Sequence, residues 1–325
     1  MNRYFYYMVL NNMLVNVLAL VPRILIRERF DGAVMALFWA AAIGTAFMYA
    51  FTKSIEKFPR QGLPEILGCI MPVWLKSCIL VGYLFVWQSA GIITMLYFAD
   101  LTRQFINPDI PNLVLICLYS VIVVWIAQFP SIKVLYLLEM IIVLCVPLIA
   151  FILFKSFFNK GMQWDGVFAV AMFYDKWPTW SAVAAATYIF TGYTNMAVFN
   201  RVFPNFRPKL LWLGGLLGFA IELTTMFLPI GMLGADAVGR YVFAWMSTAD
   251  SMRIELGFIE RVMYIFIFFI RRTCVCQHDF ALARRYGIDE KSGSDRAAAN
   301  ALSRLGTVGL RHPLCHGSSC GSQLD

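Results

Sequence analysis

Seven apolar stretches, each about as long as a bilayer is thick, follow one another along the chain and constrain its fold more than any other feature. A helix rises 1.5 Å per residue, so roughly 20 residues cross a hydrocarbon core of about 30 Å. Stretches of that kind lie at residues 4–26, 33–52, 77–98, 112–129, 134–154, 179–200 and 210–234. The pattern predicts an all-α polytopic membrane protein.

The composition supports a lipid environment and argues against an enzyme. Hydrophobic residues make up 60% of the chain and charged residues 14%, whereas an ordinary soluble domain has about 25% charged residues. The first 270 residues contain no histidine, the commonest general base and metal ligand. They also show no nucleophile–base pair, paired carboxylates or phosphate-binding glycine loop. We expect no catalytic site, no cofactor, no metal and no nucleic-acid partner.

The remaining segments fit a transmembrane domain over residues 1–270. The linkers between the apolar stretches are short and carry most of the charge, and residues 63–67 predict a short interfacial helix. An eighth apolar stretch begins at Gly257 and ends at Ile270, where Arg271 and Arg272 follow. At about fourteen residues it is too short to cross the bilayer. The sequence therefore predicts seven full spans and a partial eighth.

Two glutamates, Glu139 and Glu222, fall inside predicted spans, where an ionisable side chain is costly. One interpretation is structural, with each carboxyl group protonated or paired with a hydroxyl group inside the bundle. The other is functional, with one or both acting as an ion or proton relay. The sequence leaves both interpretations open.

Polar residues also gather in the first and sixth predicted spans. The first contains Asn11, Asn12 and Asn16, and the sixth contains Thr191-Gly192-Tyr193-Thr194-Asn195. Glycine beside side chains that compete for backbone hydrogen bonds favours an interrupted helix, and interrupted backbone in a membrane is found where it lines a cavity. Inverted-repeat transporters bind their substrate between two such helices. Plain helix packing is the alternative, as we expect for Gly214, Gly215 and Gly218 in the seventh span.

Several short motifs resemble those of one membrane-protein family. Asn11-Asn12-Met13-Leu14, followed by Leu18-Ala19-Leu20-Val21-Pro22-Arg23, resembles the first-helix signature of the spore germinant-receptor B subunits. These subunits belong to the amino acid-polyamine-organocation transporter superfamily. Further similarities follow in the same order at Phe58-Pro59, Gly82-Tyr83, Phe190-Thr191-Gly192-Tyr193 and Phe258-Ile259-Glu260-Arg261.

The resemblance implies a LeuT-like bundle of two inverted five-helix repeats, truncated here after the eighth helix. It also implies a germinant-receptor A subunit and a lipoprotein C subunit as partners, in the inner spore membrane or the cell membrane. The ligand would be a small germinant such as an amino acid, detected to trigger germination. An amino-acid permease or antiporter of the same superfamily is an alternative.

The resemblance also indicates where the ligand binds, between the first, third, sixth and eighth helices. It places the unwound part of the first helix at Val15-Asn16-Val17, and the third helix contributes lining from residues 82–91. The side chains and backbone that we expect to bind the ligand belong to the first and sixth helices: Asn16, Ala19, Leu20, Thr191, Gly192, Tyr193 and Thr194.

The last 55 residues differ in character from the rest. Residues 271–325 hold all three histidines and four of the eight cysteines, and they lack the apolar periodicity of a span. We interpret them as an aberrant or disordered polar tail, produced by a reading-frame change near codon 270. A nonfunctional product is then an alternative to a working membrane protein. A regulatory tail is an alternative. A zinc site is another, with irregularly spaced ligands at Cys274, Cys276, His312, Cys315, His316 and Cys320.

Overall fold

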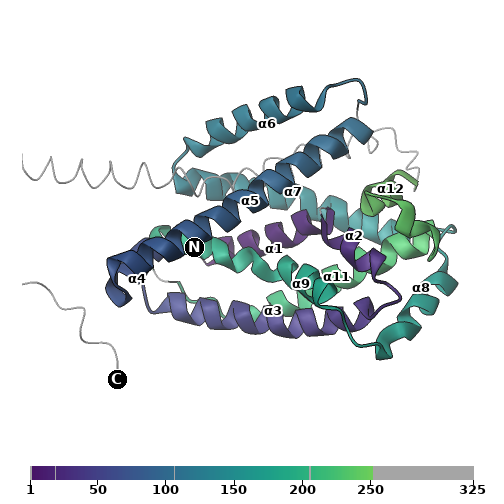
Figure 1. Cartoon of the computed structure of the whole chain (residues 1–325), viewed down its shortest axis with the longest axis horizontal. Coiled ribbons are helices and arrows are strands. Elements are labelled where there is room, and N and C mark those ends of the chain that lie inside the picture. The colour runs from purple at the N-terminus through teal and green to yellow at the C-terminus, as the bar shows by residue number, and fades with distance from the viewer. Residues whose placement is uncertain (1, 19, 106, 205, 252–325) are drawn as a thin grey trace, which may run out of the picture.

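The computed structural model describes residues 2–18, 20–105, 107–204 and 206–251, and every regular element in these ranges is helical (Figure 1). In chain order the elements are α1 Arg3–Leu18, α2 Leu20–Arg27, α3 Ala33–Glu56, α4 Leu63–Ile70, α5 Val73–Phe105, α6 Asn112–Ala127, α7 Ser131–Phe157, α8 Trp164–Ala171, η1 Met172–Asp175, α9 Trp180–Ile189, η2 Phe190–Asn195, α10 Met196–Phe199, η3 Asn200–Val202, α11 Leu211–Leu233, η4 Ala237–Arg240 and α12 Ala244–Ser251.

These helices confirm the prediction of an all-α polytopic membrane protein. Helices α3, α5, α7 and α11 are each long and apolar enough to cross a membrane, and the bent pair α1–α2 makes a fifth span. Helix α6 is a shorter apolar helix, and the sixth predicted span is divided into α9, η2 and α10. The short helix predicted at residues 63–67 is α4. The predicted partial eighth span and the tail lie outside the described residues.

The first span is interrupted, but later than the resemblance implied. Val15, Asn16 and Val17 belong to α1, which continues to Leu18, and α1 and α2 meet at an angle of 51°. Placing the unwound segment at residues 15–17 was therefore wrong. The Asn16 side chain donates a hydrogen bond to the Asn12 carbonyl one turn earlier, 2.9 Å away. Both valines are buried in a cluster with Leu18, so this turn is held as helix.

The interruption of the sixth span takes the form of a 3-10 helix. Residues Phe190–Asn195 form η2 between the α-helical segments α9 and α10. Runs of 3-10 helix longer than three or four residues are uncommon, and those in the middle of a helix often mark a hinge or a functional site. The prediction of an irregular segment at Thr191–Asn195 is confirmed in this form.

One aromatic ring explains why η2 lies where it does. Phe190, the first residue of η2, is completely buried between α3 and α11. A Cβ on Gly44 of α3 would lie 2.5 Å from the ring, and a Cβ on Gly218 of α11 would collide with it. Both glycines therefore leave space for the ring, which agrees with the packing role predicted for Gly218. Gly215 packs similarly against Thr45.

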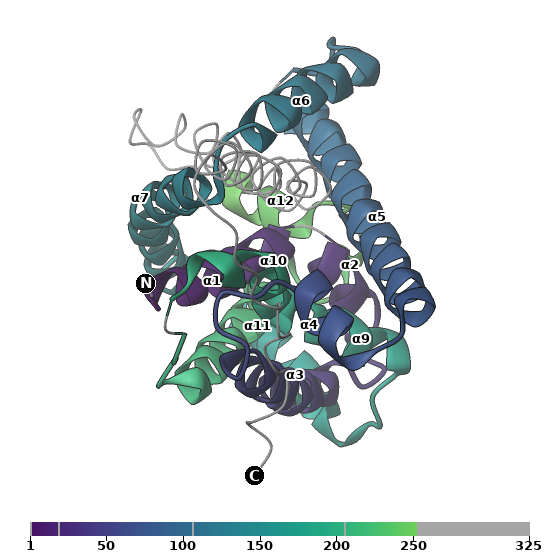
Figure 2. The same cartoon turned by 90° about the vertical axis from the view of Figure 1, so that its left-hand side faces the viewer.

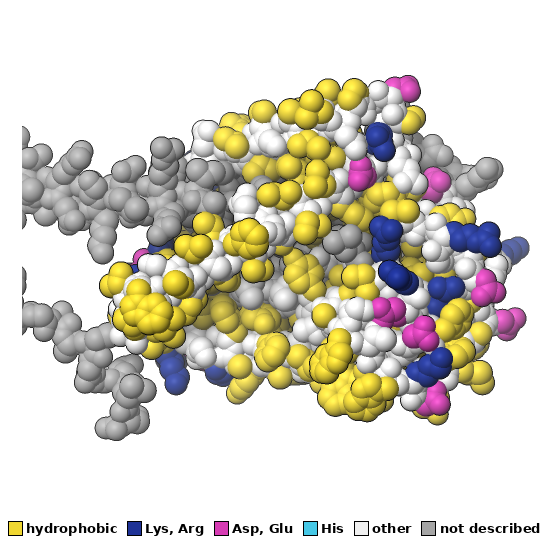
Figure 3. Space-filling view, viewed as in Figure 1, with side chains coloured by type: hydrophobic (Ala, Val, Ile, Leu, Met, Phe, Trp, Pro, Cys, Tyr) yellow, Lys and Arg dark blue, Asp and Glu magenta, His cyan; other side chains and the backbone are white. Residues whose placement is uncertain are grey.

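Helix α1 lies at the centre of the bundle, in contact with α7, α9, η2 and α11. Figure 2 shows these helices gathered around α1, with the α5–α6 pair to one side. Many apolar side chains of α5 and α6 are exposed, and they form much of the yellow surface in Figure 3. Charged side chains gather at the end where α2 and α8 lie, as expected for a protein surrounded by lipid (Figure 3).

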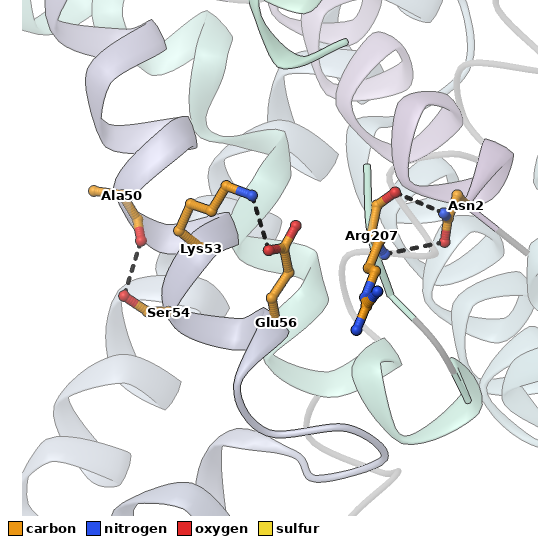
Figure 4. A network of polar contacts seen from close by, with 6 residues as sticks. All are labelled: Asn2, Ala50, Lys53, Ser54, Glu56 and Arg207. Carbon is orange, nitrogen blue, oxygen red and sulfur yellow. Dashed lines mark hydrogen bonds and ion pairs between the residues drawn. The ribbon is translucent and has the colours of Figure 1, made fainter. Parts of the chain in front are cut away.

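Figure 4 shows polar contacts between the beginning of α1 and the segment before α11, and within the last turns of α3. The Asn2 side chain donates to the carbonyl of Arg207 at 2.9 Å and accepts from its backbone N–H at 3.5 Å. These two bonds join the beginning of α1 to the segment that leads into α11. Lys53 and Glu56 form an ion pair of 2.9 Å at the end of α3.

We predict that Gly44→Ala destabilises the protein by about 1–3 kcal/mol, because the added methyl group meets the Phe190 ring. Phe190→Leu in the same chain should recover part of this loss, because the shorter side chain leaves space. Thermal unfolding in nanodiscs measures both effects. Gly82→Ala is the control, since a Cβ there meets nothing within 4 Å. Equal destabilisation by Gly44→Ala and Gly82→Ala would contradict the packing role of Phe190.

Candidate functional site

The two interrupted spans meet at one buried side chain. The Asn12 amide nitrogen, on α1, donates to the carbonyl of Ile189 at 3.0 Å and lies 3.4 Å from that of Tyr188. It also lies 3.3 Å from the Thr191 hydroxyl oxygen. These groups lie where the hydrogen-bond pattern changes from α to 3-10, which leaves carbonyls that need another donor. Asn12, on the first span, therefore supplies a hydrogen-bond donor to the backbone of the sixth span.

Gly192 allows the two backbones to approach closely. A Cβ at this position would lie 2.8 Å from both the Cβ of Asn12 and the Cα of Val9. Any side chain would push η2 away from α1 and break the Asn12 hydrogen bonds. The contact of Gly192 with α1 is a helix-packing contact, and packing was the alternative interpretation of this segment. The contact lies within η2, the interruption of the sixth span.

The two threonines of η2 direct their hydroxyl groups to the backbone. Thr191 donates to the Tyr188 carbonyl at 2.7 Å, and Thr194 donates to the Thr191 carbonyl at 2.7 Å. Asn195 likewise donates to the Gly192 carbonyl at 2.9 Å. These short-range bonds compete with α-helical bonding and stabilise the 3-10 turn. In this conformation the side-chain donors of Thr191, Thr194 and Asn195 are therefore satisfied by backbone carbonyls three residues earlier.

The third span reaches the same segment. The Tyr83 hydroxyl on α5 donates to the carbonyl of Thr194 at 3.2 Å, and its ring stacks on Trp87 with centroids 5.6 Å apart. Both residues fall in the stretch 82–91, for which the resemblance implied a lining role. The structure thus brings parts of the first, third and sixth spans together around η2.

The other predicted residues have different positions. Tyr193 is buried in the central core beside Phe51, with ring centroids 5.1 Å apart. Asn16 is buried on the last turn of α1, and Leu20 is the first residue of α2. Ala19 lies outside the described residues. Asn16 and Leu20 therefore lie at the interruption of the first span, whereas Thr191 and Gly192 lie at that of the sixth.

A small cavity lies beside the junction, on the side of α7. Its volume is about 20 Å³. Two asparagines and five apolar side chains line it: Met8, Asn11, Val134, Leu135, Leu138, Asn195 and Phe199. A single water molecule needs about 10–15 Å³ on this measure, so the cavity fits one water and is too small for an amino acid. Sequence reasoning missed it because its walls come from three distant segments.

The two glutamates have opposite surroundings. Glu139 accepts hydrogen bonds from the Arg3 guanidinium and the Tyr4 hydroxyl, both at 3.0 Å, and is partly exposed. Glu222 is completely buried on α11, and neither of its carboxyl oxygens has a hydrogen-bond partner among the described residues. Glu139 is thus paired with a hydroxyl and a guanidinium group, and its role as a relay stays a prediction. Its partners are 136 and 135 residues away, so the sequence gave no signal for them.

No group of three or more His, Cys, Asp or Glu side chains that could bind a metal occurs within the described ranges. The cysteines and histidines considered as zinc ligands all lie beyond residue 251, outside those ranges.

We predict that Asn12→Leu lowers stability by about 1–3 kcal/mol, because it removes the donor to a buried carbonyl. Thermal unfolding in nanodiscs measures the loss. Asn11→Leu is the matched control on the same helix. Asn11 is only 8% exposed but lines the small cavity and makes no side-chain hydrogen bond within the described part of the chain. If the two variants lose the same stability, the Asn12 bonds do not hold the junction.

Comparison with known proteins agrees with the geometry. No curated protein and no solved structure matches the chain. A family model described as spore germination protein matches residues 3–276, which include both interrupted spans and the whole described bundle. The chain is therefore a membrane protein of the spore germination protein family.

Proposed function

We propose that the chain is the membrane subunit of a spore germinant receptor and binds a small germinant, such as an amino acid, where α1, η2 and α5 meet. The observation that carries this proposal is the direct contact between two interrupted spans through Asn12 and Gly192. Membership of the spore germination protein family supports the biological context. The role is ligand binding and signalling rather than catalysis.

The helix ends at the interruption of the first span, together with the hydroxyls of η2, provide the chemistry that an amino acid requires. Helix α2 begins at the interruption, so its first backbone N–H groups and its positive dipole end favour a carboxylate. The last carbonyls of α1 and the acceptor oxygens of Thr191 and Thr194 suit an ammonium group. Tyr83 and Trp87 form an aromatic wall for an apolar side chain. Asn16, Ala19, Leu20, Gly192 and Tyr193 belong to the same proposed site.

Binding requires the junction to open. In the structure, the side chains of Thr194 and Asn195 donate to carbonyls within η2, and the neighbouring cavity fits one water molecule. A germinant must therefore prefer a conformation in which α5 or α1 has moved away from η2. A ligand shifts a conformational equilibrium only by its difference in affinity for the two states, and this difference is the signal. The A and C subunits in the inner spore membrane would receive it.

Binding is tested with the full chain in nanodiscs and the twenty common amino acids. We expect a small subset to raise the unfolding temperature, because a ligand at 100 times its Kd stabilises by about 2.7 kcal/mol. Thr194→Val should weaken binding of the responding amino acid about tenfold, or about 1.4 kcal/mol. Thr224→Val is the control, since this hydroxyl on α11 also donates to the carbonyl three residues earlier.

Three outcomes would count against the proposal. If Thr194→Val and Thr224→Val lose the same amount of binding affinity, the germinant does not bind at η2. Amino-acid flux through proteoliposomes that contain the chain without other subunits would favour the permease alternative. A germinant response that is unchanged in spores lacking the chain would exclude the receptor role.

A further inference from the structure

Glu222 differs from every other glutamate in the described part of the chain. Each of the other four accepts a hydrogen bond or forms an ion pair: Glu28 with Thr179 and Ser181, Glu56 with Lys53, Glu65 with Arg201, and Glu139 with Arg3. Glu222 is 0% exposed, and both of its carboxyl oxygens lack a partner within the same residues. An ionised carboxylate in such a place costs several kcal/mol or more. The carboxyl group of Glu222 therefore needs either a basic side chain nearby or a bound proton.

The packing of α11 places Glu222 beside the interruption of the first span. Two contacts show that α1 and α11 run in the same direction. The Tyr6 hydroxyl accepts from the backbone N–H of Leu210, and Met13 lies beside Gly218, two turns further along both helices. Glu222 follows Gly218 by four residues and so lies on the same face of α11. Counting four residues from Met13 on α1 reaches Val17, in the last turn before the interruption. Helix α11 also contacts α2, on the other side of the interruption.

The charged residues on the elements packed against α11 are exposed, paired or both. On α1, α2 and α3 they are Arg3, Arg23, Arg27, Lys53 and Glu56; on α8, η4 and α12 they are Asp165, Arg240 and Asp250. Helix α9 has none. The tyrosines of α1 and α3 lie near the Leu210 end of α11, where Tyr6 contacts Leu210 and Met48 lies beside Gly214. None of these groups supplies a hydrogen bond to Glu222.

We propose that Glu222 is a proton-binding site that senses whether the interruption of the first span is closed. In the closed conformation the carboxyl group holds a proton. When α1 and α2 move away from α11, water reaches the group, the O–H bond breaks, and the proton passes to water and leaves a solvated carboxylate. Opening thus releases one proton, so alkaline conditions favour the open conformation.

This coupling goes beyond the proposed function and does not depend on the identity of the germinant. With one proton released per opening event, the equilibrium between closed and open conformations changes by up to tenfold per pH unit. A conformational change at the junction then depends on the pH of the compartment that the opened site faces.

Infrared spectroscopy of the full chain in nanodiscs tests the proposal directly, because a protonated carboxyl group has a C=O stretching band separate from that of a carboxylate. We expect this band at neutral pH in the natural protein, its loss in Glu222→Gln, and its retention in the control Glu139→Gln. If Glu222→Gln does not accumulate, Glu222→Asp keeps the acid and should shift the band. A spectrum that is unchanged by substitution of Glu222 would overturn the proposal.

The coupling has its own test in the pH dependence of thermal unfolding. In the natural protein the unfolding temperature should fall as the pH rises above about 4.3, the ordinary pKa of a glutamate, since the unfolded chain then releases a proton that the buried group still holds. Glu222→Gln is neutral and of the same size, so its profile should be flatter over that range. Parallel profiles for the two proteins would exclude a coupled proton at Glu222.

Discussion

The hydrogen bond from Asn12 to the Ile189 carbonyl is the interaction on which the rest of the junction depends. A membrane interior offers no water to bond with free backbone groups, so an interrupted span must find its partners inside the protein. The first and sixth spans solve this problem together. Asn12 of one bonds to the carbonyl at which the other leaves α-helical geometry, and Gly192 lets the two backbones come close enough.

Two further features hold η2 in place. The Phe190 ring fits between glycines on α3 and α11, and the hydroxyls of Thr191 and Thr194 donate to the carbonyls of Tyr188 and Thr191. The result is an interruption in which the side chains of Thr191, Thr194 and Asn195 all bond to the backbone. These bonds are local and can be exchanged for bonds to a ligand, whereas the contacts of Phe190 reach two other helices, α3 and α11. The segment can thus change its partners without loss of the surrounding fold.

The four long apolar helices and the bent pair α1–α2 could be predicted from the sequence, because the length of an apolar stretch follows directly from the thickness of the bilayer. The irregular segment at Thr191–Asn195 could also be predicted, because glycine and threonine act locally on the backbone. The interruption of the first span was placed too early, since the bond from Asn16 to Asn12 and the burial of Val15 and Val17 favour helix there. The partners of Phe190 and Glu139 come from distant helices and depend on tertiary packing. The same holds for the isolation of Glu222, which no local pattern distinguishes from Glu139.

The most direct test of the central claim is to locate a bound solute on the chain. A photoreactive analogue of the amino acid that stabilises the protein would be activated in membranes, and the labelled peptides identified by mass spectrometry. We predict labelling of peptides that contain residues 8–20, 83–87 or 188–196, and loss of the label when excess unmodified amino acid is present. Labelling confined to the outer faces of α6 and α7, or unaffected by competition, would contradict binding at the junction of the two interrupted spans.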